Sequence, residues 1–164
     1  ALTDLVRARW TETIQEEWIR NVLRDYKDIP RERLETTLTL MNQNVREGLV
    51  YGFEALIPAL NLPDPDDRHV FAAAIHANAG AIITFNLKDF PDDLLKPFGI
   101  RAQHPDEFIA ELIELDTATV CAAVRTHRAS LKKPPKTQTE FLEILEKQGL
   151  VITAGMLREV QEFI

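Results

Sequence analysis

The sequence predicts an α/β protein with a parallel sheet, followed by a helical C-terminal extension. Over residues 1–103, segments with strand character alternate with amphipathic helical segments, which is the order found in parallel sheets. Residues 81–83 form a short, continuous apolar run, as expected for a strand covered on both faces. From residue 104 onward the patterns are helical, so we expect two domains, 1–103 and 104–164.

Two helices are predicted before the central part of the chain. The predicted elements are, in order, the end of a helix at 1–5, a strand at 6–10, a helix capped by Thr11 or Thr13, a turn at 26–30, a helix from 31 to about 46, a strand at 48–53 and a connector at 54–60. Ile14 and Trp18 are spaced to anchor the first helix on a core, which would point Glu17 inward. The alternative for Glu17 is an exposed helical charge, as most glutamates are.

An acidic loop opens the next predicted helix. Asp64 is a good N-cap, Pro65 suits the first helical position, and Asp66 and Asp67 fall in the first turn, where the helix dipole favours anions. Gly80 is expected to end this helix. Its alanines recur along one side, which indicates a backbone lying close to a sheet. Of the three aspartates we prefer Asp67 as a ligand, with Asp64 structural and Asp66 solvated.

Polar side chains follow the predicted strand at 81–83. In open parallel sheets ligands bind beyond the carboxyl ends of the strands, where Thr84, Asn86 and Asp89 would lie with Asp67. Carboxylates that are close together repel unless one has a raised pKa or a cation is present. An oxygen-rich set of this kind suits Mg²⁺ or Mn²⁺. The alternative needs no metal: the aspartates of the loop cap the helix and interact with its dipole, contributing ~0.3–1 kcal/mol each.

Other charged residues near this loop have two interpretations each. Arg68 and Lys88 are either contacts for phosphate groups of a ligand or ordinary surface charges. His69 and His76 are seven residues apart on one helix, about two turns, which does not suit a shared zinc ion. We expect both to be surface residues or supports for other ligands.

The C-terminal extension is expected to be a set of amphipathic helices. Helices are predicted from about 104 to 115, from 116 or 117 to about 131, from 137 or 139 to 148, and from 153 to the end, with a break at 132–136. These helices either cover the sheet domain or bind a partner. A basic patch either contacts RNA or is solvated, and it consists of Arg125, Arg128, Lys132, Lys133 and Lys136.

The composition of the chain argues against several classes of protein. The chain has 164 residues, of which 45% are hydrophobic, so it can bury a core, and no apolar run is long enough for a membrane span. The single cysteine, Cys121, cannot form an internal disulfide, which favours a reducing cytoplasm. The formal charge of −7 opposes non-specific binding to nucleic acid. Glycine-rich phosphate loops, Cys-x-x-Cys and Gly-x-Ser-x-Gly motifs are absent from the sequence.

Two motifs resemble those of the PIN-domain nucleases, in particular the bacterial branch related to VapC-type toxins. They are Asp-Pro-Asp-Asp-Arg-His-Val at 64–70 and Ile-Ile-Thr-Phe-Asn-Leu-Lys-Asp-Phe-Pro at 82–91, and the similarity extends over nearly the whole chain. The resemblance implies a Mg²⁺- or Mn²⁺-dependent endoribonuclease with a three-layer α/β/α parallel sheet in residues 1–103. It implies these roles: catalytic Glu17, Asp67, Asn86 and Asp89; metal ligands Glu17, Asp67 and Asp89; supporting Thr84 and Asp64; RNA contacts Arg68 and Lys88.

The sequence also departs from that family. Relatives begin with a strand that ends in an aspartate, which has no counterpart in this sequence, and Asn86 stands where many relatives carry aspartate. We therefore keep two alternatives to a toxin ribonuclease held inactive by an antitoxin. One is a catalytically incomplete domain that binds RNA or protein, and the other is a regulatory α/β domain with an acidic pocket. A homodimer remains one option for the oligomeric state.

Overall fold

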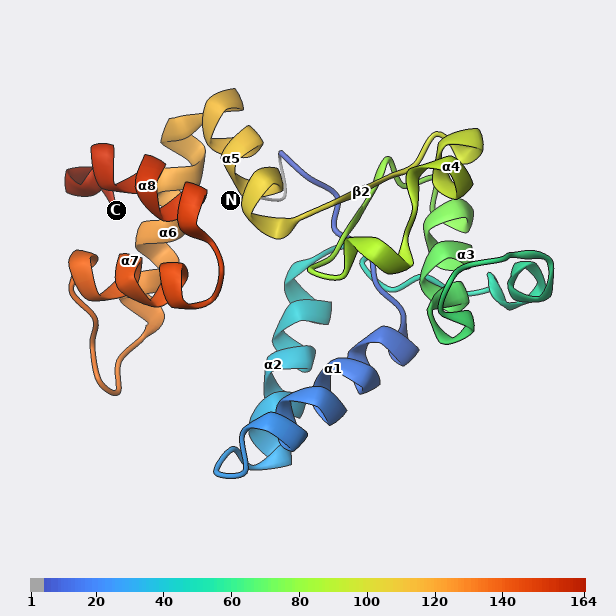
Figure 1. Cartoon of the computed structure of the whole chain (residues 1–164). Coiled ribbons are helices and arrows are strands. Elements are labelled where there is room, and N and C mark those ends of the chain that lie inside the picture. The colour runs from blue at the N-terminus through green and yellow to red at the C-terminus, as the bar shows by residue number, and fades with distance from the viewer. Residues whose placement is uncertain (1–4) are drawn as a thin grey trace. The chain divides into compact units, whose positions relative to one another are not determined.

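The computed structural model describes residues 5–164, which form two compact units (Figure 1). The N-terminal unit comprises Arg7–Ile82 and Lys88–Ala102, and the C-terminal unit comprises Ile83–Leu87 and Gln103–Ile164 with the first described residues. The predicted α/β class with parallel strands is confirmed. The helix end predicted at 1–5 falls, apart from Leu5, outside the described residues. The domain boundary at 103/104 stays a prediction.

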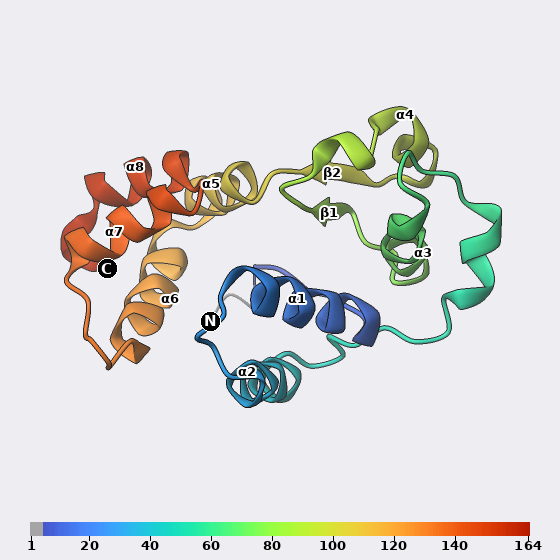
Figure 2. The ribbon, with the colours of Figure 1, turned by 60° about the horizontal axis from the view of Figure 1, so that its bottom comes forward.

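The N-terminal unit begins with a pair of helices, α1 (Glu12–Asp25) and α2 (Arg31–Asn44), that pack side by side (Figures 1 and 2). Thr11 is the N-cap of α1, since its hydroxyl accepts a hydrogen bond from the Ile14 N–H at 3.1 Å. The buried residues of α1 are Gln15 and Ile19. Trp18 is 37% exposed, so the prediction that Trp18 anchors the helix is wrong. The inward face is set instead by the i, i+4 row of Thr11, Gln15 and Ile19.

The strands predicted at 6–10 and 48–53 are reduced to one parallel bridge between Trp10 and Leu49. Trp10 donates its backbone N–H to the Gly48 carbonyl, and the Val50 N–H returns to the Trp10 carbonyl, each at 2.8 Å. A Cβ at Gly48 would lie 2.7 Å from the Trp10 ring, so glycine is required for this close approach. The indole N–H of Trp10 also bonds to the Asn42 side chain at 2.8 Å, which ties α2 to the same segment.

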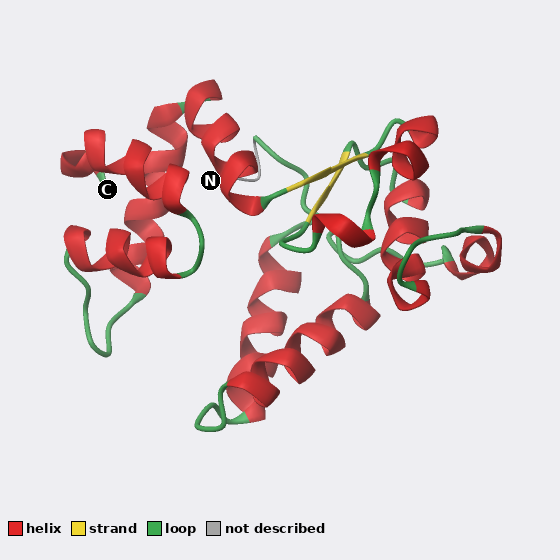
Figure 3. Cartoon of the chain, in the orientation of Figure 1, coloured by secondary structure: helices red, strands yellow, loops and turns green. Residues whose placement is uncertain are grey.

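Two α-helices, two strands and four 3-10 turns follow α2 in the chain. The elements are η2 (Glu54–Ala59), η3 (Pro65–Asp67), α3 (Arg68–His76), β1 (Ala81–Ile83), η4 (Leu87–Asp89), α4 (Asp92–Leu95), η5 (Lys96–Phe98) and β2 (Arg101–Gln103). The two strands pair in parallel, as bonds from the Arg101 N–H to the Gly80 carbonyl and from the Thr84 N–H to the Gln103 carbonyl show (Figure 3). In the described residues this named sheet has two strands.

Helix α3 is packed through its alanines. Phe71–Ala74 are buried and share one core with Ile82 of β1 and Ile100, which precedes β2. The predicted close approach of the helix backbone to a sheet stays a prediction, because the elements that α3 mainly contacts are η2 and η3. The helix ends at His76 rather than at Gly80, because Asn78 takes the left-handed conformation (φ 51°). The Ala79 N–H then bonds to the Ala74 carbonyl and the Asn78 N–H to the Ile75 carbonyl, which is a Schellman ending.

The C-terminal unit contains α5 (Pro105–Leu115), α6 (Thr117–Ser130), α7 (Gln138–Lys147), α8 (Val151–Glu159) and η6 (Gln161–Phe163), shown in Figure 2. Asp116 caps α6, Thr137 caps α7 through a capping box with Glu140, and Gly149 (φ 85°) follows α7, as predicted. Its core is formed by Leu112, Ile113, Val120, Cys121, Leu142, Leu157 and Ile164. Among the described residues, every helix is too short or too polar to cross a membrane.

Helix α8 receives its N-terminal cap from another helix. Asp106, in the first turn of α5, is 4% exposed, and its carboxylate accepts the Ile152 and Thr153 N–H groups at 2.8 Å each. The helix therefore begins at Val151 and not at Thr153 as predicted. Burial by itself raises the pKa of Asp106, but the hydrogen bonds from Thr153 and Ile152 outweigh burial and place its pKa below 3.8.

Replacing Asp106 with asparagine is expected to destabilise the protein by about 1–3 kcal/mol, because one buried helix N–H would then face an amide donor. Since folding lowers the pKa of Asp106, its contribution is present above pH 3.8 and is lost as the pH falls through the folded-state pKa. Urea unfolding at pH 7 and at acidic pH measures both effects. Glu107→Gln, which removes an exposed charge one residue away, is the control and should change little. Equal losses in the two variants would contradict the capping role.

Candidate metal centre

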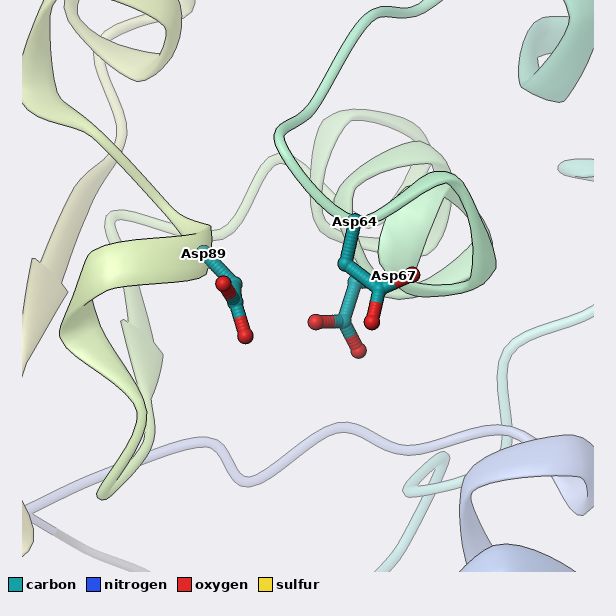
Figure 4. Close-up of side chains that lie close together, drawn as sticks. All are labelled: Asp64, Asp67 and Asp89. Atoms are coloured by element: carbon teal, nitrogen blue, oxygen red, sulfur yellow. The ribbon is translucent and has the colours of Figure 1, made fainter.

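Three carboxylates converge at the start of α3. Asp64, Asp67 and Asp89 each offer an oxygen, and these oxygens lie within 4.8 Å of one another. Figure 4 shows the side chains of Asp64 and Asp67 beside each other, with Asp89 approaching from η4. Asp64 is exposed, whereas Asp67 and Asp89 are half-buried. We call these three residues the acidic cluster.

Local structure places the two loop aspartates. Asp64 is the N-cap of η3, and its side chain accepts the Asp66 N–H at 2.9 Å, so the predicted capping role is confirmed. The Asp67 N–H donates to the Asp64 carbonyl at 3.3 Å, and Asp67 immediately precedes α3. The backbone turn of η3 thus brings residues i and i+3 to one side, which aligns both carboxylates. Asp64 therefore contributes to the cluster as well as capping, a dual role that the sequence analysis missed.

The environment of the acidic cluster disfavours the ionised form of Asp67. Burial raises the pKa of Asp67, the negative charges of Asp64, Asp89 and Glu17 raise it further, and His69 opposes them in part. The pKa of Asp67 is therefore above its usual value of 3.8. Clustered carboxylates of this kind hold a proton more tightly than isolated ones, or they bind a cation.

The donor set fits a hard divalent cation. With metal–oxygen distances of about 2.1 Å, ligands on opposite sides of Mg²⁺ stand about 4.2 Å apart, and the corresponding spacing around larger ions is greater. Oxygens within 4.8 Å of one another can reach one such ion with sub-ångström shifts. Carboxylate oxygens without nearby thiols favour Mg²⁺ or Mn²⁺ over soft metals.

Glu17 lies at the edge of this site. It is carried by α1, and its Oε2 stands 3.2 Å from Nε2 of His69, the second residue of α3, with the two side chains 36% and 11% exposed. Its charge raises the pKa of Asp67, so the two carboxylates face the same region. Glu17 is outside the group of three oxygens that lie within 4.8 Å. Both ring nitrogens of His69 are buried and make no hydrogen bond to the described residues.

The neighbouring glutamate has a different partner. Glu16 is exposed and accepts from the Arg31 guanidinium at 2.8 and 3.0 Å, which makes it a surface ion pair between α1 and α2. Glu16 and Glu17 are adjacent in the chain but therefore have different partners, Arg31 and His69. No local pattern in the sequence indicates the Glu17–His69 contact, because it joins residues that are 52 positions apart in the chain.

The remaining predicted site residues are placed as follows. Thr84 follows β1, and its hydroxyl accepts the Asn86 N–H at 3.0 Å. These two residues belong to the C-terminal unit, so their part in the cluster stays a prediction. Arg68 donates from Nε to the Pro65 carbonyl at 2.8 Å, and Lys88 is exposed in η4. Their predicted contacts with RNA also stay predictions.

Comparison with known proteins identifies the family. The family model described as the VapC50 C-terminal domain matches residues 105–159. A curated protein of Mycobacterium tuberculosis (strain ATCC 25618 / H37Rv), named "Putative ribonuclease VapC50", is 36% identical over 117 residues, which cover 71% of this chain and 69% of that protein. No solved structure matches the chain significantly. The family predicted from the two motifs is confirmed, and the chain belongs to the VapC-type PIN nuclease family.

Proposed function

We propose that this protein is a metal-dependent endoribonuclease of the toxin type, with the acidic cluster as its metal site. The observation that carries the proposal is the convergence of Asp64, Asp67 and Asp89, whose oxygens lie within 4.8 Å of one another. The name of the M. tuberculosis relative supports ribonuclease activity and a toxin class. Membership of that class also suggests an antitoxin protein as partner, and the full three-layer α/β/α sheet is part of the same proposal.

In the proposed mechanism, the three aspartates would hold Mg²⁺ or Mn²⁺. Such an ion supplies Lewis-acid polarisation of a phosphoryl oxygen and a lower pKa for a bound water. Glu17, directed to this region from α1, adds a fourth carboxylate that binds the metal or accepts a proton from the attacking water. The Asn86 amide can orient water or RNA but cannot act as a carboxylate base.

His69 is proposed to position Glu17. Its Nε2 faces Glu17 Oε2 at 3.2 Å from the first turn of α3, and this close polar contact, which does not have the alignment of a hydrogen bond, would hold the carboxylate toward the cluster. The surrounding burial excludes competing water from the ring nitrogens. This contact explains how a residue of α1 is held in register with a loop that follows it by some fifty positions in the chain.

Replacement of Asp67 by asparagine is expected to weaken Mn²⁺ binding by roughly tenfold or more, since removing even a supporting group around a metal commonly has that effect. Cleavage of RNA should fall by roughly 100-fold, which corresponds to about 2.7 kcal/mol of transition-state stabilisation. Isothermal titration calorimetry with MnCl₂ and a gel assay of RNA cleavage measure the two quantities. Asp66→Asn, which removes a neighbouring carboxylate outside the cluster, should leave both unchanged. Undetectable Mn²⁺ binding by the unmodified protein would favour the non-catalytic binding module.

The same Asp67→Asn substitution is expected to stabilise the metal-free protein at pH 7. Because folding raises the pKa of Asp67, its ionisation costs stability as the pH rises through that pKa, and the amide removes this cost. The gain should be roughly 0.5 kcal/mol after allowance for solvent screening. It should vanish below pH 3.8, where Asp67 is protonated in both states. Urea unfolding in EDTA tests this, and lower stability of the variant at pH 7 would argue against repulsion within the cluster.

Substitutions of His69 distinguish a role through the polar contact of Nε2 with Glu17 from a packing role. Glutamine places an amide nitrogen near the position of Nε2, whereas asparagine reaches only the position of Nδ1 and leucine keeps the volume without a donor. We expect His69→Gln to retain Mn²⁺ affinity within roughly threefold, and His69→Asn and His69→Leu to lose roughly tenfold. When a His69 substitution is combined with Glu17→Gln in a double-mutant cycle, the losses of Mn²⁺ affinity should be non-additive. When it is combined with Glu16→Gln, the effects on Mn²⁺ affinity should be additive. Equal affinity in all three His69 variants would exclude positioning through Nε2.

A further inference from the structure

The C-terminal unit contains a segment whose charge contrasts with the rest of the chain. Between Thr117 and Thr139 the sequence has five Lys and Arg residues and neither Asp nor Glu, although the whole chain carries a formal charge of −7. The five are Arg125, Arg128, Lys132, Lys133 and Lys136. Separation of charge on an acidic protein creates a local positive potential that attracts anions.

Part of this segment surrounds an open hollow on α6. Its volume is about 730 Å³, and its lining residues are Arg125, Thr126, Ala129, Ser130 and Lys132. The small residues at 126, 129 and 130 lie on the last turns of the helix and leave room at its surface, while Arg125 and Lys132 are exposed long cations at the rim. We call these five residues the basic hollow.

Arg128 holds the lysine-bearing loop against α6. It is half-buried, and its guanidinium donates to the Lys136 carbonyl at 2.9 Å and to the Ile164 carbonyl at 3.3 Å. Arg128 is therefore occupied by the backbone and is not a ligand-binding group. Its effect is to fix the loop that follows Ser130, so that Lys132 is presented at the hollow with less conformational entropy to lose on binding.

The helix dipole explains only part of this charge. Cations in the last turn of α6, Arg128 among them, compensate the negative C-terminal end of the helix. Arg125 lies about one turn earlier and is exposed; one nitrogen of its guanidinium donates to the Phe163 carbonyl over a long distance, 3.5 Å, whereas Arg128 is half-buried and makes two such bonds. Lys132 and Lys133 lie beyond the helix. The hydroxyls of the floor donate inward, from Thr126 to the Ala122 carbonyl and from Ser130 to the His127 carbonyl. Binding of an anion here therefore depends on the cations of the rim.

We propose that the basic hollow binds the phosphate backbone of single-stranded RNA. The identity of the polyanion rests on the proposed function, in which RNA is the substrate. From Arg125 to Ser130 α6 rises about 7.5 Å, and Lys132 follows two residues after the helix ends. Two cations at the two ends of this stretch suit neighbouring phosphates of a strand better than one free phosphate. None of the five lining residues is aromatic, so base stacking is absent and the contact is independent of sequence.

The test compares two double variants that remove the same charge from the same unit. Arg125→Gln/Lys132→Gln removes both rim cations, and Lys147→Gln/Arg158→Gln removes two exposed cations from α7 and α8 outside the hollow. Binding of a labelled single-stranded RNA is measured by fluorescence anisotropy in EDTA over a series of NaCl concentrations. We expect the rim variant to bind roughly tenfold more weakly, with a salt slope smaller by about 1.4 for two lost contacts. The control variant should keep the slope of the unmodified protein.

Equal RNA affinity and equal slopes in the two double variants would overturn the inference. So would displacement of the RNA by inorganic phosphate as effectively as by unlabelled RNA at matched ionic strength, since that outcome describes a single-anion site. Cleavage of the same RNA with Mn²⁺ is measured separately. Rim-dependent RNA binding in a protein that does not cleave would support this inference and overturn the proposed activity. If the protein cleaves the RNA but substitution of the rim cations does not change RNA binding, this inference is overturned and the proposed activity is not.

Discussion

Repulsion among the carboxylates of Asp64, Asp67 and Asp89 is the constraint on which the candidate site depends. The fold holds their oxygens within 4.8 Å of one another, and burial together with the charges of the neighbouring carboxylates raises the pKa of Asp67. Such repulsion between side chains persists only where the surrounding structure holds the carboxylates in place. The turn of η3 supplies the short spacing of Asp64 and Asp67, and η4, after β1, supplies Asp89. A cation would remove the repulsion, which links the stability of this region to metal binding.

The scaffold around the cluster depends on close approach of backbones. The buried run Phe71–Ala74 lets α3 pack against the core that contains Ile82 and Ile100, because alanine adds little volume between helix and strands. At the other end of the same unit, Gly48 leaves space for the Trp10 ring, and this fixes the chain just before α1. Helix α1 then carries Glu17 to His69. The position of the fourth carboxylate is thus set by packing that lies outside the acidic loop.

Charged side chains are arranged differently in the two units. In the N-terminal unit anionic side chains converge at the start of a helix, where the dipole offsets part of their repulsion. In the C-terminal unit a buried carboxylate, Asp106, is stabilised by the N–H groups at the start of α8, and a run of cations without acids surrounds the end of α6. The proposed metal site and the proposed polyanion site therefore lie in different units. The family resemblance spans both, since the C-terminal family model matches 105–159 and the relative covers 71% of the chain.

Local signals in the sequence determined the caps and the acidic loop. Asp64, Thr11, Asp116 and Thr137 act as caps where their residue types and neighbours indicate it, and the apolar run 81–83 forms β1. Each of these features depends on residues within a few positions, so periodicity and capping chemistry suffice to find it. The same holds for the two family motifs, which are contiguous in the chain.

Only the tertiary structure decided the features that join distant residues. Trp18 has the spacing of a core residue yet is exposed, because the buried face of α1 carries Gln15 and Ile19 instead, and Gln15 bonds to Asn42 of α2. Helix α8 starts two residues before its apparent cap, since Asp106 reaches across from α5. Asp89 joins Asp64 and Asp67, and His69 meets Glu17, through contacts that no local pattern encodes. The sequence determines which side chains are available and how each segment begins and ends, whereas packing across the chain decides which of them meet.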